Sequence, residues 1–279
     1  LKNLLLHASL VENLHRHRGN CAERRWKPLI PKTGKAEAKG KSETMDEKVR
    51  HALIIAAGRG VRFGNTTHLY PKPLIEVAGI PLLYRTFLTA REAGIDHFTI
   101  VTGYKSECLE DYICNGIPRG LSAKCLRNEN WQRQNGLSVL RAKGHLPDRF
   151  VLLMADHLFE ADILRNLVST SLPSDHCRLA VDFHPERISD LADATKVAVH
   201  EGRVIDIGKE ITHYNAIDTG IFLCTGAIFE GLERAIYSGK ETLSDGIREL
   251  ACCQRMEATD IGDLFWQDID DEASRTEGE

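Results

Sequence analysis

The segment from residue 53 to residue 74 carries the side chains that point most directly to chemistry. An apolar run at 53–57, typical of a buried strand, leads into glycines and cationic residues at Gly58, Arg59, Gly60, Arg62, Gly64 and Lys72. Glycine lets the backbone approach anionic oxygens and present N–H donors, and arginine and lysine add positive charge at the same place. Because Lys72 stands between two prolines, its ammonium can be held toward phosphates at low entropic cost. The segment predicts a polyphosphate cradle.

The glycine loop by itself also fits an ordinary turn after a strand. Its glycines do not complete the dinucleotide-binding fingerprint, because position 63 is Phe63. No helix-forming stretch follows before Pro81. The loop therefore indicates phosphate binding only when it is taken together with Lys72.

The elements that must position this loop alternate in type along the chain. Strand-like runs are expected at 52–57, 98–102, 123–127, 150–155 and 179–183. Helical patterns fall between them at 82–93, 107–113, 137–143 and 161–168. Such alternation predicts βαβ units and a parallel sheet, whose ligands bind at the carboxyl ends of the strands. The glycine loop leaves the first strand at that edge.

The later part of the chain has a different pattern. A hairpin is expected at 196–200 and 203–207, followed by a strand at 216–224 and helices at 227–237 and 243–251. Short apolar pieces around Ile261 and Phe265 come last. We expect these elements to extend the same domain.

Composition limits the classes of function. The chain has 279 residues, 42% of them hydrophobic, which fits one large α/β domain. Residues 1–44 have a net charge of +6, so the net charge of −4 leaves −10 for the remainder, which is evidence against nucleic acid as a partner. The 8 cysteines form no CxxC pair, so a disulfide framework or zinc site is not expected and a reducing cytoplasm fits. No apolar stretch approaches the roughly 18 to 20 residues of a membrane span.

The first 44 residues are predicted to be a poorly ordered basic extension, and residues 45–279 a single domain. The extension is polar and interrupted by proline and glycine. Met45 stands just before the first strand, so translation from it would yield the whole domain. A targeting peptide is the alternative, although the apolar run of the extension is short and interrupted.

The cradle resembles the sugar-phosphate nucleotidyltransferases, whose pattern is an apolar strand, A-A-G-x-G-x-R-[LF], and then P-K-P-L. The matching residues are Ala56, Ala57, Gly58, Gly60, Arg62, Phe63 and Pro71-Lys72-Pro73-Leu74. The resemblance implies an α/β, Rossmann-like three-layer nucleotidyltransferase (GT-A-like) fold with a mixed, mostly parallel central sheet. It also implies that the first four matching residues contact the nucleotide and that Arg62 and Lys72 are catalytic.

The same resemblance implies a magnesium site. Asp156 follows a buried strand at the position of the family's metal-binding carboxylate, although a helix N-cap is the alternative reading. Asp268 lies in a segment similar to the family's W-x-D and is the expected second ligand, with Asp270 in reserve. The chain then departs from the family, with Asp271-Glu272-Ala273 in place of Thr-Pro-Glu.

Further motifs resemble the CTP:inositol-1-phosphate cytidylyltransferases. They are Asn130 to Ser138, Ala155-Asp156-His157, Ala194 to Val197, Gly208-Lys209-Glu210, Tyr214 to Gly220 and Leu243 to Gly246. The resemblance implies CTP and inositol 1-phosphate as substrates, Mg²⁺ as cofactor, and CDP-inositol and pyrophosphate as products. Family members are often fused to a membrane-embedded synthase domain, which this chain lacks, so a link to a separate membrane synthase is expected.

Individual residues of this subgroup have competing interpretations. Lys209 matches the position that grips the acceptor's phosphate, and Asp218 the one that binds acceptor hydroxyls; a solvated lysine and a turn residue are the alternatives. Gln134, Asn135 and Gly136 are expected to contact the nucleotide, where Asn-Gly could read the base, but this dipeptide is also a common turn. Trp131 fits base stacking or ordinary packing equally well.

The expected reaction needs positioning and charge neutralisation. A phosphate oxygen of the acceptor is already anionic near neutral pH, so its attack on the α-phosphorus of CTP requires no general base. Two alternatives remain open: a relative that activates phosphocholine, a phosphonate or a hexose 1-phosphate with CTP or UTP, or a non-catalytic regulatory homologue. The sequence does not predict the oligomeric state.

Overall fold

The computed structural model describes residues 48–63 and 66–278. The extension expected at residues 1–44 and the start expected at Met45 lie outside the described residues. Within the described part of the chain, no helix combines the length and the apolar character that crossing a bilayer requires.

A nine-stranded sheet runs through the described residues in the order β5-β4-β1-β6-β11-β8-β12-β10-β9. Its strands are β1 (His51–Ala56), β4 (His97–Thr102), β5 (Ser122–Arg127), β6 (Arg149–Met154), β8 (Cys177–Asp182), β9 (Lys196–His200), β10 (Arg203–Gly208), β11 (Ala216–Thr225) and β12 (Met256–Asp260). The strands predicted from sequence are confirmed to within two residues at each end. β12 was not predicted, because its five residues show no clear alternation of apolar and polar types.

The sheet is mixed, as expected. β5, β4, β1 and β6 pair in parallel, and β11 then enters antiparallel to both β6 and β8. β12 is parallel to β8, and β10 and β9 form the predicted antiparallel hairpin. The parallel half therefore places the carboxyl ends of β1 and β6 side by side, with Ile55 opposite Met154.

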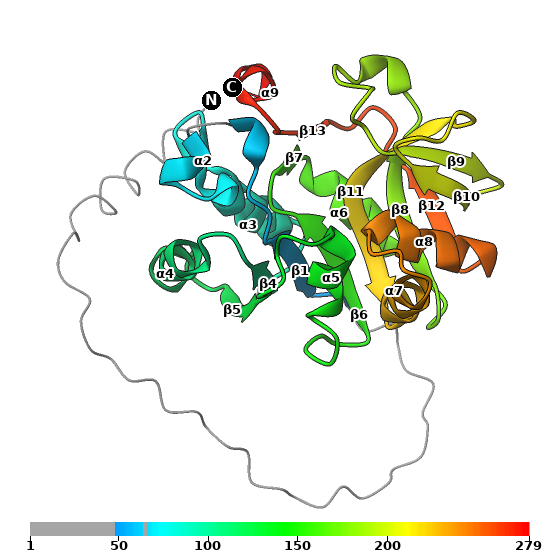
Figure 1. Cartoon of the computed structure of the whole chain (residues 1–279), viewed down its shortest axis with the longest axis horizontal. Helices are drawn as coiled ribbons and strands as arrows, with labels where there is room; N and C mark the ends of the chain where they lie inside the picture. The colour runs from blue at the N-terminus through cyan, green and yellow to red at the C-terminus, as the bar shows by residue number, and fades with distance from the viewer. Residues whose placement is uncertain (1–47, 64–65, 279) are drawn as a thin grey trace, which may run out of the picture. The chain divides into compact units, whose positions relative to one another are not determined.

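Helices cover both faces of the sheet, which makes three layers (Figure 1). One apolar core contains residues of α3 (Leu82–Glu92), α4 (Ser106–Gly116) and α6 (Ala161–Ser169). The other contains residues of α5 (Asn135–Leu140), α7 (Ala227–Tyr237) and α8 (Leu243–Cys252). Side chains of β1 alternate between the cores, Ala52 and Ile54 in the first and Leu53 in the second, because successive side chains of a strand point to opposite faces.

Several short elements surround the carboxyl edge of the parallel strands. They are η1 (Val61–Phe63), α2 (Thr66–Leu69), η2 (Lys72–Leu74), β2 (Glu76–Val77), β3 (Ile80–Pro81), β7 (His157–Phe159), η3 (Pro185–Arg187), β13 (Trp266–Asp268) and α9 (Glu272–Glu277). The expectation that no helix precedes Pro81 was wrong for the single turn of α2. Elements of two to six residues are too short to show a period in the sequence.

The C-terminal segment returns through β13 to β7, the short strand that follows β6. β13 pairs antiparallel with β7 (Figure 1), and in the register of the pair Asp268 lies opposite His157. α9 follows, and its N-cap residue Asp271 accepts a hydrogen bond from the backbone N of Ser274 at 2.8 Å. The departure from the family pattern at residues 271–273 thus forms a capping box, which starts the final helix.

Candidate active site

A cavity of about 280 Å³ opens at the carboxyl ends of β1 and β6. Its lining includes Ala56, Gly58, Gly60, Arg62, Lys72, Asp156 and Asp270. Backbone of the glycine loop, two cationic side chains and two carboxylates thus meet in one hollow. The alternative of a plain turn does not account for this convergence of charge.

Gly60 allows the loop to pass tightly over Lys72. Its φ of +66° lies in the left-handed region, and a Cβ at this position would come within 2.8 Å of the Lys72 Cβ. The backbone N of Phe63 donates to the Gly60 carbonyl at 3.2 Å, and the Phe63 side chain is buried. The loop is therefore anchored by Phe63 and curved at Gly60, which leaves space for the lysine stem.

Lys72 forms a buried cluster with two carboxylates. Its side chain is 7% exposed, and its Nζ donates to Asp156 Oδ2 at 2.6 Å and to Asp270 Oδ1 at 2.5 Å. Burial by itself lowers the pKa of Lys72, but the surrounding carboxylates raise it above its ordinary value, so the ammonium stays charged. We call Lys72, Asp156 and Asp270 the buried cluster.

Arg62 connects the buried cluster to a second group of charges. One guanidinium nitrogen lies 2.5 Å from Asp270 Oδ2, and the other lies 2.5 Å from Asp193 Oδ2. The remaining oxygen of Asp193, Oδ1, accepts from Lys209 Nζ at 2.5 Å. We call Arg62, Asp193 and Lys209 the exposed bridge. Positive and negative groups therefore alternate from Asp156 to Lys209.

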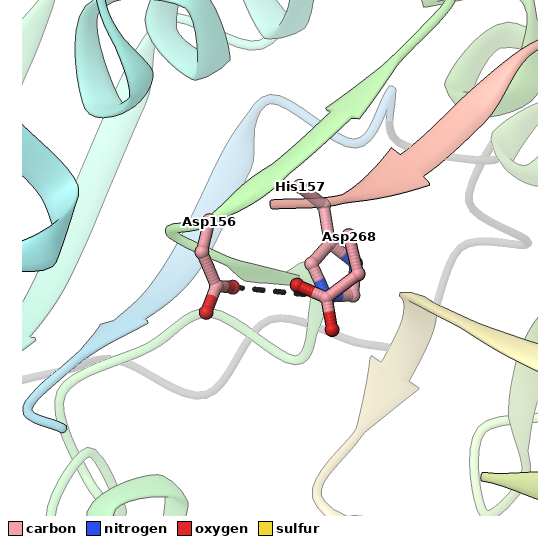
Figure 2. Close-up of side chains that lie close together, drawn as sticks. All are labelled: Asp156, His157 and Asp268. Atoms are coloured by element: carbon pink, nitrogen blue, oxygen red, sulfur yellow. Dashed lines mark ion pairs between the residues drawn. The ribbon is translucent and has the colours of Figure 1, made fainter. Parts of the chain in front are cut away.

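Asp156, His157 and Asp268 form a compact group of potential metal ligands (Figure 2). One ligand atom from each lies within 4.8 Å of the others. Asp268 Oδ1 is buried and has no hydrogen-bond partner among the described residues, which leaves a hard oxygen available for a cation. Carboxylate oxygens are the ligands that hard divalent cations such as Mg²⁺ and Ca²⁺ take in proteins. The donor set thus fits a divalent metal.

His157 is held in a fixed orientation behind these carboxylates. Its Nδ1 donates to the Thr219 carbonyl at 2.8 Å, so its Nε2 faces Asp268 Oδ1 at 3.5 Å. Burial lowers the pKa of His157, but the two nearby carboxylates outweigh it and raise the pKa above the ordinary value. Burial, together with the charge of Asp156, raises the pKa of Asp268 to about 7. Both shifts indicate an excess of negative charge around His157 and Asp268.

The structure gives the two C-terminal aspartates different contacts. Both oxygens of Asp270 are engaged, Oδ1 by Lys72 and Oδ2 by Arg62. Asp268 lies farther from Lys72, at 3.9 Å, and faces the group that contains Asp156 and His157. The geometry therefore groups Asp268, and not Asp270, with Asp156 and His157.

The expected nucleotide-contacting residues 134–136 lie at the junction of α5 and α8. Gln134 is the N-cap residue of α5, and Asn135 Oδ1 accepts from the backbone N of Leu243 at 2.9 Å. The backbone N of Gly136 donates to the Glu241 carbonyl at 3.1 Å. The dipeptide therefore begins a helix and joins it to α8; it does not form a turn.

Asp218 and Lys209 lie on the antiparallel side of the sheet. Burial raises the pKa of Asp218 to about 6, and its Oδ1 accepts from the backbone N of Gly220 at 2.8 Å. The backbone N of Asp218 donates to the Thr195 carbonyl at 2.9 Å, which ties β11 to the segment that contains Asp193. Sequence reasoning missed Asp193. It stands directly before the Ala194 to Val197 motif, and this position is the signal that could have pointed to it.

The fold and this site define a nucleotidyltransferase. A family model described as the MobA-like NTP transferase domain matches residues 52–235. The chain belongs to this family, because the match extends over more than half of it.

Curated relatives and a solved structure agree with this family. The bifunctional IPC transferase and DIPP synthase of Rubrobacter xylanophilus is 36% identical over 223 residues, which cover 78% of this chain and 49% of that protein. The protein of the same name from Aquifex aeolicus is 33% identical over 223 residues, which cover 80% of this chain and 49% of that one. The chain spans about half the length of these relatives. The inositol-1-phosphate CTP transferase from T. maritima is similar with a TM-score of 0.71 at 25% identity, covering 82% of this chain and 93% of that one.

Proposed function

We propose that the protein transfers a cytidylyl group from CTP to inositol 1-phosphate and releases CDP-inositol and pyrophosphate, with Mg²⁺ as cofactor. The observation that carries the proposal is the series of alternating charges that leads from Asp156 through Lys72 and Arg62 to Lys209. It offers cations for a triphosphate at one end and for an acceptor phosphate at the other. The similarity to an inositol-1-phosphate CTP transferase supports the choice of substrates.

In this proposal the glycine loop and two cations receive the triphosphate. Backbone groups of Ala56, Ala57, Gly58 and Gly60 approach the nucleotide, because glycine leaves no side chain between the backbone and the phosphates. Arg62 and Lys72 neutralise the negative charge that develops on the pyrophosphate. Gln134, Asn135 and Gly136, which are not among the residues that line the cavity, are proposed to contact the nucleoside.

Asp156 and Asp268 would hold the magnesium ion, which supplies charge neutralisation and orientation for the triphosphate when bound. The unpartnered oxygen of Asp268 supports this assignment. Asp270 keeps Lys72 and Arg62 in place through its two oxygens. His157, whose Nε2 lies near both Asp156 and Asp268, orients these two carboxylates.

The acceptor is proposed to bind on the side of Lys209 and Asp218. Lys209 contacts its phosphate, and Asp218 accepts hydrogen bonds from ring hydroxyls. The phosphate oxygen then attacks the α-phosphorus in line, and pyrophosphate leaves. Since the phosphate is already ionised near neutral pH, positioning of the two substrates is the main contribution of the protein.

A pyrophosphate-release assay tests the proposal. CTP, UTP, GTP and ATP are each combined with inositol 1-phosphate, phosphocholine, 2-aminoethylphosphonate and glucose 1-phosphate in the presence of Mg²⁺. We expect the highest kcat/KM for CTP with inositol 1-phosphate. Turnover only with glucose 1-phosphate, or only with UTP, would replace the proposed substrates with those of another nucleotidyltransferase. The absence of turnover with every pair would favour a regulatory homologue.

The names of the curated relatives also support a functional link to a synthase. They combine an IPC transferase with a DIPP synthase. We infer that the nucleotide product of this domain is consumed by such a synthase activity. Addition of a membrane fraction that contains a DIPP synthase should convert the product when a second inositol phosphate is present.

A further inference from the structure

Asp193 lies between Arg62 and Lys209, the two cations that the proposed function assigns to the substrates. Its Oδ2 is 2.5 Å from Arg62 and its Oδ1 is 2.5 Å from Lys209, so each carboxylate oxygen pairs with one cation. The three side chains are 44%, 37% and 49% exposed for Arg62, Asp193 and Lys209, respectively. The exposed bridge is therefore open to solvent and to ligands, unlike the buried cluster beside it.

The segment that carries Asp193 is shaped by local contacts. The backbone N of Asp193 donates to Asp190 Oδ1 at 3.2 Å, and the backbone N of Ala194 donates to the Asp190 carbonyl at 3.1 Å. Lys196 Nζ donates to the Lys209 carbonyl at 2.8 Å, which ties the backbone at Lys209 to the start of β9, just after Asp193. These contacts present the carboxylate of Asp193 at a defined place between the cations.

Two cations held about a carboxylate form a site for a tetrahedral oxyanion. A phosphate monoester carries up to two negative charges and three acceptor oxygens, whereas a carboxylate carries one charge and two oxygens. Ion pairs between half-exposed side chains contribute little to stability, so their replacement by contacts with a phosphate costs little free energy. A dianionic phosphate is thus the stronger ligand for the same two cations.

We propose that Asp193 occupies the place of the acceptor's phosphate in the ligand-free protein and is displaced when that phosphate binds. This inference rests on the proposed function, because it concerns the same acceptor side of the site. Asp193 acts as a specificity residue. Monoanionic esters and carboxylates carry no more charge than the Asp193 carboxylate, so they displace it poorly and bind weakly at the exposed bridge. A dianionic phosphate monoester binds there most tightly.

Phosphate binding to the full chain tests the inference without either proposed substrate. Inorganic phosphate is titrated at pH 8 by calorimetry into the wild type and Asp193→Asn, with neither metal nor nucleotide present. Removal of the competing charge should lower the Kd for phosphate by about three- to tenfold. An unchanged or higher Kd in Asp193→Asn would overturn the inference and assign Asp193 to holding the cations in place.

Two further variants separate a local effect from a general change in charge. Asp263→Asn removes the same charge from the exposed ion pair that Asp263 makes with Arg187 at 2.9 Å, and it should leave the Kd unchanged. The double variant Asp193→Asn/Lys209→Ala should lose the gain in affinity, because the vacated cation is absent. A gain retained in the double variant, or an equal gain in Asp263→Asn, would contradict displacement at the bridge.

Kinetics supply a readout that a purely structural role would not move. Asp193→Asn should lower the KM for the acceptor while the KM for the nucleotide stays within twofold. Because the phosphate titration uses neither CTP nor inositol 1-phosphate, failure of the proposed substrates in the pyrophosphate assay leaves the displacement testable. Conversely, if Asp193→Asn has an unchanged affinity for phosphate while the wild type shows the proposed turnover, only the displacement of Asp193 is contradicted.

Discussion

The buried cluster and the exposed bridge use the same kinds of charged group but differ in burial. Lys72 is 7% exposed, whereas the cations of the bridge are 44% and 49% exposed. A buried ion must be paired, because an uncompensated charge in the interior is costly. An exposed ion pair exchanges its partner for water or ligand at little cost. The buried cluster is therefore part of the framework of the site, whereas the cations of the exposed bridge are available to exchange their partner for a ligand.

Loss of the central cation of the buried cluster should have the largest effect. Lys72→Met leaves Asp156 and Asp270 without the ammonium that they share, while Arg62 still pairs with Asp270. The free energy of unfolding at pH 8 should therefore fall by about 3 kcal/mol, and turnover should be lost. The hydrogen bond with Asp268 and the charge of Lys72 lower the pKa of Asp270, and the charge of Lys72 lowers the pKa of Asp156. The deficit should shrink as pH falls, because protonation of these carboxylates removes their repulsion in the variant. Urea unfolding at pH 8 and pH 5 measures both effects.

A matched control lies on the surface. Lys143 pairs with Glu233, and the two side chains are 51% and 47% exposed. Lys143→Met should change the free energy of unfolding by less than about 1 kcal/mol. If Lys72→Met were no more destabilising than Lys143→Met, the buried cluster would not be part of the framework.

Removal of the Asp268 carboxylate should affect metal binding more than the fold. Asp268→Asn should raise the Mg²⁺ concentration for half-maximal activity at least about tenfold and should weaken Mn²⁺ binding, followed by electron paramagnetic resonance without substrates. Asp270→Asn should change Mn²⁺ binding less, since both its oxygens already contact cations. The opposite ranking would make Asp270 the second metal ligand.

Arg62 belongs to the bridge and should matter for catalysis without supporting the fold. Arg62→Ala should lower kcat/KM for the nucleotide by about a hundredfold, because a cation near the departing pyrophosphate is lost. The free energy of unfolding should change by less than about 1 kcal/mol. Arg187→Ala removes another exposed arginine and should alter neither quantity. A change in kcat/KM of less than threefold in Arg62→Ala would exclude Arg62 from the chemistry.

The smallest effect is expected at the far end of the bridge. Lys209→Ala should raise the KM for the acceptor by about tenfold and leave the KM for the nucleotide unchanged, because only one phosphate contact is removed. Steady-state kinetics with each substrate varied in turn distinguish the two. A higher KM for the nucleotide alone would move Lys209 to the nucleotide side of the site.

Local motifs in the sequence anticipated much of the site because their chemistry depends on neighbouring residues. Gly60 and Lys72 stand 12 positions apart, and the structure places the lysine side chain under the glycine. Asp156 follows a buried strand, and strand ends in a parallel sheet meet at one edge. The roles of these residues stay predictions, but their proximity follows from the order of strands and loops.

Contacts between distant segments could not be anticipated in the same way. Arg62 and Asp193 are separated by 131 positions, and no periodicity or motif links a surface aspartate to a particular arginine. The position of Asp268 beside Asp156 and His157 depends on the pairing of β13 with β7, a register of three residues. The sequence also did not predict that β11 lies between β6 and β8, because an apolar strand pattern does not specify the neighbouring strands.

The sequence predicts an α/β domain whose first strand ends in a loop rich in glycine and cationic residues, since glycine, proline and periodic apolar residues act over short distances. The packing of distant segments sets which charges are buried together and which remain open to ligands. Burial depends on every element packed around a side chain, and it alone separates Lys72 from Lys209, two lysines that each pair with aspartate.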